Sequence, residues 1–202
     1  MTKHRSPDER VDQILTAARN CFLKHGYFAT KMDAIAKESG LSKGGVYFHF
    51  TSKREIFKAL VEQEYEAAME FIDRTMESES NMIMILSELA EHFVQLFASS
   101  DRPRFMVIIG EMALRDKEIA TLLRKLQMSY FETISTLLER GIADGQIKSI
   151  DVHSTAVILK SLLDGIQANF AVGLDFDLEK VITAGIELLM HGIVNFDENI
   201  TG

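Results

Sequence analysis

The sequence contains little cysteine and no long apolar run. Its single cysteine, Cys21, has no second cysteine with which to form an internal disulfide or a thiolate metal site. No stretch approaches the roughly 18 consecutive apolar residues of a membrane-spanning helix, and the N-terminus leads into charged residues rather than an apolar signal core. We therefore expect a cytoplasmic protein with no membrane partner.

Turn-forming residues are also scarce. The 202 residues include only two prolines and twelve scattered glycines, fewer than an all-β chain of this length would need. Hydrophobic residues make up 47% and charged residues 26%, values that are ordinary for globular proteins and that decide against disorder. We predict an all-α fold of about nine helices.

Charge is unevenly placed along the chain. The net charge is −8, but residues 1–58 contain eleven Lys and Arg against six Asp and Glu, a net of +5. Residues 59–202 contain eleven against twenty-four, a net of −13. A basic head on an acidic body predicts that the head alone binds a polyanion.

Apolar residues at helical spacing and helix-capping residues locate the expected helices. Capping boxes are predicted at Ser6–Glu9, Thr30–Asp33 and Ser52–Glu55. The expected helices lie at about 7–25, 31–38, 42–49, 52–76, 82–98, 105–114, 117–141, 151–172 and 177–195.

Two short helices flank a turn at Ser39-Gly40-Leu41, which is the pattern of a helix-turn-helix. The surrounding run, YFATKMDAIAKESGLSKGGVYFHFTSKREIF, closely resembles the DNA-binding head of the TetR family of bacterial transcriptional regulators. The resemblance implies an N-terminal three-helix DNA-binding domain at residues 1–52 and a helical ligand-binding and dimerisation domain at residues 53–202. Matching positions include Gly26, Thr30, Ile35, Ala36, Gly40, Leu41, Ser42, Gly44, Val46, Tyr47, Phe48, Phe50, Ser52 and Lys53.

Carried over by position, the resemblance implies a set of residues that line double-stranded DNA. Gly44 and Gly45 have no side chains to hold the helix away from base edges. Side chains at the starts of the second and fourth helices are expected to contact phosphates. The whole set is Thr30, Lys31, Ser42, Lys43, Gly44, Gly45, Tyr47, His49 and Lys53.

Each of these assignments has an alternative. Lys43, His49 and Lys53 could be ordinary solvated side chains. Gly45 stands where many relatives carry a larger residue, so one base contact is expected to be missing or made through water. Four apolar residues of the two short helices and their flanks are interpreted as core of the head: Met32, Val46, Phe48 and Phe50.

The resemblance also implies a small-molecule pocket in the body and a homodimer. The candidate pocket residues, for which plain bundle core is the alternative, are Phe93, Phe97, Phe105, Ile109, Met112, Phe131 and Gln167. The eighth helix carries a seam with steps of four and three, and the ninth is apolar around much of its circumference. We therefore expect a dimer interface formed by Leu159, Leu163, Ile166, Phe170, Leu178, Val181, Gly185 and Leu188.

These expectations combine into a homodimeric repressor that binds a palindromic operator and is released by a hydrophobic or amphipathic effector. One alternative is a DNA-binding regulator without an effector. Another is a helical enzyme that uses Glu111, Asp164 or His153 as acid or base, but no nucleophile or phosphate-loop motif supports an enzyme. No cofactor is expected. No metal site is expected either, since His92, His153 and His191 lie on different predicted helices.

Overall fold

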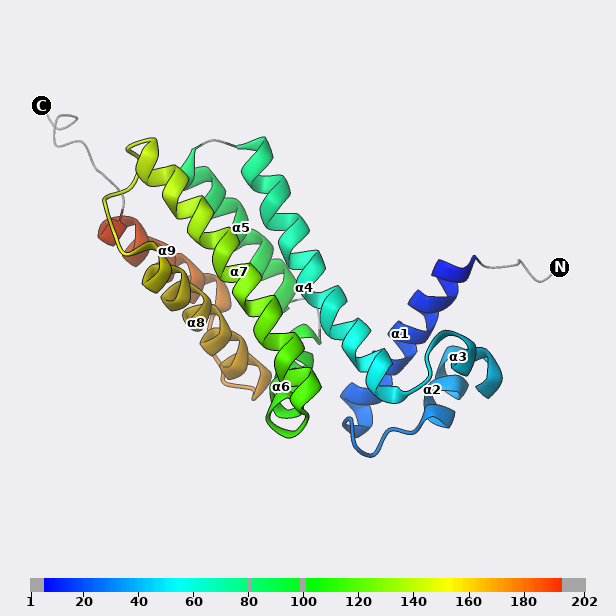
Figure 1. Cartoon of the computed structure of the whole chain (residues 1–202). Coiled ribbons are helices and arrows are strands. Elements are labelled where there is room, and N and C mark those ends of the chain that lie inside the picture. The colour runs from blue at the N-terminus through cyan, green and yellow to red at the C-terminus, as the bar shows by residue number, and fades with distance from the viewer. Residues whose placement is uncertain (1–5, 80, 99–100, 194–202) are drawn as a thin grey trace, which may run out of the picture. The chain divides into compact units, whose positions relative to one another are not determined.

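The computed structural model describes residues 6–79, 81–98 and 101–193, and within these ranges the chain forms nine helices and no strand (Figure 1). This confirms the all-α class, and each helix lies where the sequence predicts it, with ends that differ by a few residues. The helices are α1 (Pro7–His25), α2 (Met32–Ser39), α3 (Lys43–His49), α4 (Lys53–Ser78), α5 (Met82–Ala98), α6 (Arg102–Arg115), α7 (Lys117–Ala143), α8 (Val152–Ala171) and α9 (Leu178–Ile193).

The chain divides into two compact units. The first comprises residues up to 66 together with residues 104–124, and the second comprises residues 67–103 with those from 125 onward. The division differs from the expected boundary at residues 52–53. The reason is that α4 begins at this point and the side chains of its first turns, Ile56, Phe57 and Leu60, are fully buried.

An aromatic cluster forms the centre of the first unit. The ring of Phe57 lies 5.6 Å from that of Phe22 and 5.0 Å from that of Tyr27, in edge-on arrangements. Phe105 of α6 adds a fourth ring, 5.9 Å from Phe57. Helix α6 therefore contributes to the core of the first unit.

The second unit is a helical bundle with two hydrophobic clusters. The larger cluster joins α4, α5, α7 and α8 through residues such as Ile72, Ile85, Leu137 and Ala156. The smaller centres on Leu178 and Ile182 of α9, against which residues of α5 and α8 pack. Figure 1 shows α5, α7, α8 and α9 running alongside one another.

Candidate nucleic-acid interface and ligand cavity

The turn between α2 and α3 has the geometry of a helix-turn-helix. Gly40 adopts the left-handed conformation, with φ of +67°, which glycine reaches without steric cost. Its N–H donates to Lys37 O at 3.2 Å, and the next N–H, of Leu41, donates to Ala36 O at 3.0 Å. These bonds satisfy the last carbonyls of α2 and turn the chain directly into α3.

Helix α3 begins as the sequence predicts. Ser42 caps it, and its hydroxyl accepts a hydrogen bond from the N–H of Gly45 at 3.1 Å. A side chain at Gly44 would meet no protein atom within 4 Å, whereas a Cβ at Gly45 would lie 3.3 Å from the hydroxyl of Ser42. Gly44 therefore leaves the start of α3 open, and Gly45 keeps the cap undisturbed.

Four of the predicted DNA contacts present exposed side chains, one of which is the capping residue Ser42. Tyr47 is 43% exposed, and Lys31 and Lys43 are also exposed. The ammonium of Lys43 lies 2.7 Å from a carboxylate oxygen of Asp33, and this hydrogen bond raises the pKa of Lys43 above its ordinary value. His49 is half-buried, with its ring edge-on to Phe48 at 5.1 Å.

Thr30 has a structural role that differs from the expected phosphate contact. Its side chain is only 2% exposed, and its hydroxyl donates to Gly26 O at 2.8 Å and to Cys21 O at 3.2 Å. The predicted Thr30–Asp33 capping box is therefore not formed. Lys31 is the N-cap of α2 instead, with no side-chain cap, so the first N–H groups of this helix remain available to an anion.

The Lys53 ammonium also differs from its expected role as a phosphate clamp. It donates to Tyr27 O at 2.6 Å and to Thr30 O at 2.7 Å, and it lies 4.3 Å from the centre of the Tyr27 ring. Burial lowers the pKa of this ammonium. The side chain thus fixes the start of α4 to the segment between α1 and α2, because a partly buried cation needs such acceptors.

Phe48 is a residue whose position sequence reasoning assigned wrongly. We expected it in the core of the head, but its side chain is 85% exposed, whereas Val46 is fully buried. Two residues along an α-helix correspond to about 200° of rotation, so Val46 and Phe48 occupy opposite sides of α3. This spacing is the available signal, and it leaves Phe48, like Tyr47, exposed on α3.

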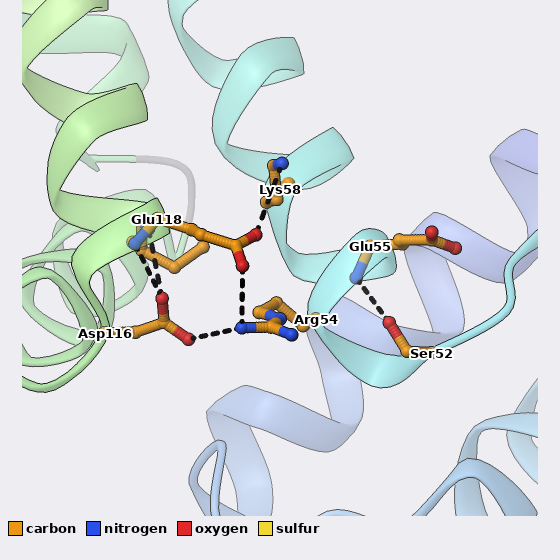
Figure 2. A network of polar contacts seen from close by, with 7 residues as sticks. Ser52, Arg54, Glu55, Lys58, Asp116 and Glu118 are labelled. Carbon is orange, nitrogen blue, oxygen red and sulfur yellow. Dashed lines mark hydrogen bonds and ion pairs between the residues drawn. The ribbon is translucent and has the colours of Figure 1, made fainter.

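A network of ion pairs joins the start of α4 to the start of α7 within the first unit (Figure 2). Arg54 Nη1 lies 3.1 Å from Glu118 Oε1 and 3.6 Å from Asp116 Oδ2, and Lys58 lies 3.8 Å from the Glu118 carboxylate. Asp116 also accepts the N–H of Glu118 at 2.9 Å and so caps α7. Arg54 immediately follows Lys53, so this network and the Lys53 contacts position the same turn of α4.

The second unit contains a partly open apolar cavity of about 120 Å³. It lies between four helices, and aliphatic side chains dominate its wall. The lining comprises Leu86, Leu89, Ala90 and Phe93 of α5, Tyr130, Ile134, Leu137 and Leu138 of α7, Leu159, Leu162, Leu163 and Ile166 of α8, and Val181, Ile182, Gly185, Ile186 and Leu189 of α9.

The structure separates the residues expected in a pocket. Of the expected set, Phe93 lines the apolar cavity. Phe131 lines a separate groove beside His153, and Gln167 is buried but outside the cavity lining. The Phe97 side chain lies outside the described residues. The remaining three residues are buried in the first unit and line neither the apolar cavity nor this groove: Phe105, Ile109 and Met112.

The α8 residues expected at the dimer interface make packing contacts within their own chain. Leu163, Ile166 and Phe170 pack against the α9 cluster, and Leu159 packs against the larger core cluster. Sequence spacing identifies an apolar face but not its partner, which here is the same chain. Four residues of α9 were also expected at the interface. Of these four, Leu178 is buried, Val181 and Gly185 line the cavity, and Leu188 is largely exposed, at 77%.

A different set of apolar residues is exposed on α8 and at its C-cap, Val172. Helical spacing places Ile158, Leu162, Gly165 and Val172 on a common side, and all four are exposed.

Among the described residues, no group of three His, Cys, Asp or Glu side chains is placed to hold a metal ion. No helix in the described part of the chain is both long and apolar enough to cross a membrane.

Comparisons with known proteins agree with this geometry. Residues 14–60 match the family described as bacterial regulatory proteins of the tetR family, and residues 108–195 match the C-terminal region of QacR-like proteins. The uncharacterized HTH-type transcriptional regulator YfiR of Bacillus subtilis (strain 168) is 30% identical over 199 residues, which cover 95% of both chains. The fatty acid metabolism regulator protein of the same organism is 25% identical over 187 residues, covering 91% of this chain and 95% of the relative.

Solved structures share the fold over nearly the whole chain. SmeT in complex with triclosan is 21% identical with a TM-score of 0.80, covering 96% of this chain and 97% of that one. SmeT is the repressor of the multidrug efflux pump SmeDEF of Stenotrophomonas maltophilia. A transcriptional regulator from Saccharomonospora viridis in complex with choline is 20% identical with a TM-score of 0.80, covering 94% and 100%.

The helix-turn-helix and these relatives define a DNA-binding transcriptional regulator. The chain belongs to the TetR family of bacterial regulatory proteins.

Proposed function

We propose that the protein is a homodimeric repressor that binds a palindromic operator and is released from it by a small hydrophobic or amphipathic effector. One observation carries this function. The chain builds a helix suited to the major groove in one compact unit and a partly open apolar cavity in the other. A DNA-binding surface and a separate ligand cavity are the two parts that a ligand-responsive regulator requires.

The DNA surface is formed by α3 and the start of α2. The N-terminal residues of α3, with Gly44 at its open start, approach base edges, while Tyr47 contacts phosphates or neighbouring bases. Lys31 and the uncapped N–H groups of α2 bind a phosphate. Lys43 contacts DNA after it releases Asp33, an exchange that the solvent exposure of both side chains allows.

The dimer forms through the exposed apolar residues of α8 and α9, namely Ile158, Leu162, Gly165, Val172 and Leu188. Apolar side chains gathered on one face are a common mark of an interface. Association of identical surfaces is two-fold symmetric, so the two heads read inverted half-sites and the operator is palindromic.

The effector occupies the apolar cavity. Its wall includes residues of α8 and α9, the same helices that expose the proposed dimer face. A bound effector therefore changes the packing of helices that form the interface. An effector shifts the protein only if it binds one head spacing more tightly than the other. Complexes of structural relatives with triclosan and choline support small-molecule binding in this fold. We assign the chain no enzymatic activity, because its relatives are transcriptional regulators.

The test is footprinting of the purified protein on the DNA that flanks its own gene, at two salt concentrations, with and without a panel of apolar and amphipathic compounds. We expect salt-sensitive protection of a palindrome that one class of compound abolishes. Protection that no compound changes would favour a regulator without an effector. Sedimentation of the same sample reports the dimer, and a monomer that binds one half-site would contradict the proposed assembly.

A further inference from the structure

One flank of α8 carries three polar side chains, two of which are buried in the second unit. Lys160, Asp164 and Gln167 are spaced by four and three residues and so share one side of the helix. Lys160 is 9% exposed and Gln167 is 6% exposed. We call these three residues the polar flank. Buried Lys and Gln are uncommon and need partners, so the flank requires an explanation.

Gln167 is short of a partner. Its side-chain Nε2 is buried and makes no hydrogen bond to any residue that the structure describes. Leaving a buried donor unsatisfied costs on the order of 1–3 kcal/mol. Side chains on an α-helix lean toward its N-terminus, which brings the Gln167 amide toward the turn that carries Asp164.

Lys160 reaches the same turn from the other direction. Its ammonium pairs with Asp164, four residues further along the helix. The ammonium also lies 5.5 Å from the centre of the Tyr130 ring, and Tyr130 lines the apolar cavity. The Lys160 ammonium and the unpartnered Gln167 amide therefore belong to one side of α8, and Tyr130 connects Lys160 to the cavity wall, which the three flank residues themselves do not line.

We propose that the polar flank binds the carboxylate of an amphiphile whose hydrocarbon chain occupies the apolar cavity. This inference rests on the effector cavity of the proposed function and names the chemical class of its ligand. A carboxylate offers two acceptor oxygens, which match the ammonium of Lys160 and the amide of Gln167. Asp164 is 43% exposed, so its carboxylate can turn to water when the ligand replaces it.

The same arrangement disfavours other head groups. A quaternary ammonium would bring a second cation beside the buried Lys160, which costs free energy in a weakly screened site. An alcohol would offer one acceptor to two donors. Ligand pockets generally combine an apolar wall with a few placed polar groups, and here the cavity supplies the wall and the polar flank the head-group contacts.

The volume of the cavity sets the size of the probe. An apolar cavity of about 150 Å³ accepts benzene, so the 120 Å³ seen here holds a hydrocarbon end of roughly that size. Octanoate has enough chain to fill it and to extend toward the polar flank. Octanol and octyltrimethylammonium carry the same chain with a neutral and a cationic head group.

The experiment measures binding of these three compounds to the full chain by isothermal titration calorimetry. We expect octanoate to bind at least about tenfold more tightly than the other two. Lys160→Met and Gln167→Leu should each remove most of this preference, whereas Lys180→Met, at an exposed lysine of α9, should leave it unchanged. Asp164→Asn should tighten octanoate binding, because the ligand no longer competes with the native carboxylate.

The Asp164→Asn variant keeps the test informative if a buried substitution prevents folding, which circular dichroism would reveal. Equal affinity for all three compounds would overturn the carboxylate site while leaving an effector cavity in place. Preference for the cation, or no binding of any of the three, would also overturn it. Operator footprinting in parallel shows separately whether the proposed regulator function holds.

Discussion

The guanidinium of Arg54, at the start of α4, lies 3.1 Å from the carboxylate of Glu118, at the start of α7. These residues are far apart in the sequence, and both belong to the first unit. The pair adds α7 to the elements that hold the turn immediately after the helix-turn-helix. The Arg54 guanidinium also pairs with the carboxylate of Asp116, so Arg54 bridges two acidic side chains (Figure 2).

We predict that this pair stabilises the protein only modestly. Arg54 is about half exposed, and such ion pairs contribute roughly 0–1 kcal/mol. A double-mutant cycle with Arg54→Ala and Glu118→Ala, measured by urea unfolding, should give a coupling free energy in this range that disappears in about 1 M salt, where screening is nearly complete. A coupling that persists at high salt would mean that the contact is not mainly electrostatic.

Substitution of Lys43 tests the DNA surface directly. Lys43→Ala should weaken operator binding and lower the slope of log affinity against log salt concentration by about one, the value of one phosphate contact. Asp33→Asn should strengthen binding, because it frees the Lys43 ammonium. The measurement is fluorescence anisotropy over a range of salt concentrations. Lys180→Ala is the matched control at an exposed lysine of the second unit, and an equal effect there would remove α3 from the interface.

Phe48 and Tyr47 offer a second test of the same helix. Phe48→Ala should leave the free energy of unfolding within about 0.5 kcal/mol of the parent, since an exposed side chain contributes little to the core. Both Phe48→Ala and Tyr47→Ala should reduce operator affinity while sedimentation still shows the parent assembly. Unchanged affinity for both variants would contradict the exposed face of α3 as a DNA surface.

Thr30 should behave as a structural residue. Thr30→Val removes the hydroxyl that donates to Cys21 O and Gly26 O, so the free energy of unfolding should fall by about 1–3 kcal/mol. Thr30→Ser keeps the hydroxyl and should retain more of the stability. If Thr30→Val instead leaves stability intact and weakens DNA binding, the hydroxyl contacts phosphate after all.

Two leucines distinguish the inner and outer faces of the α8–α9 pair. Leu188→Glu places a charge on an exposed apolar side chain and should dissociate the dimer without unfolding the subunit, particularly when combined with Ile158→Glu. Leu163→Glu should instead unfold the second unit, because Leu163 packs against the α9 cluster. Sedimentation and circular dichroism together separate these outcomes, and a dimer that survives Leu188→Glu with Ile158→Glu would place the interface elsewhere.

His92 should make stability depend on pH. Its ring stacks on Phe71 at 3.5 Å, and burial, with the nearby charges of Arg102 and Arg74, holds the pKa of His92 below its ordinary value of 6.5. Below that pH the unfolded chain binds a proton that the folded chain does not, so the free energy of unfolding should fall as the pH decreases.

His92→Phe keeps a stacked ring and removes the titration, so its unfolding free energy should decline less between pH 7 and pH 5. Urea unfolding at several pH values measures the difference. His153→Gln, at an exposed histidine, is the control. Parallel pH profiles for the parent and His92→Phe would show that His92 does not contribute.

The sequence by itself determined the helices and the helix-turn-helix. Capping residues, the glycine of the turn and apolar spacing are local features, and each acts within a few residues of where it lies. Ser42 capping α3 and Gly40 in the left-handed conformation show this directly. The N-terminal motif was therefore recognisable before any packing was known.

Only the tertiary structure decided which partner each apolar face takes. Phe105 was expected in a ligand pocket but packs with the head, and Leu163 was expected at a dimer interface but lines the cavity of its own chain. Periodicity predicts that a face is buried but not which element covers it. The reason is that the hydrophobic effect is non-directional and scales with the apolar area removed from water, whichever partner removes it. The polar roles of Thr30 and Lys53 were hidden for a related reason, since their acceptors are backbone carbonyls that the fold brings within reach.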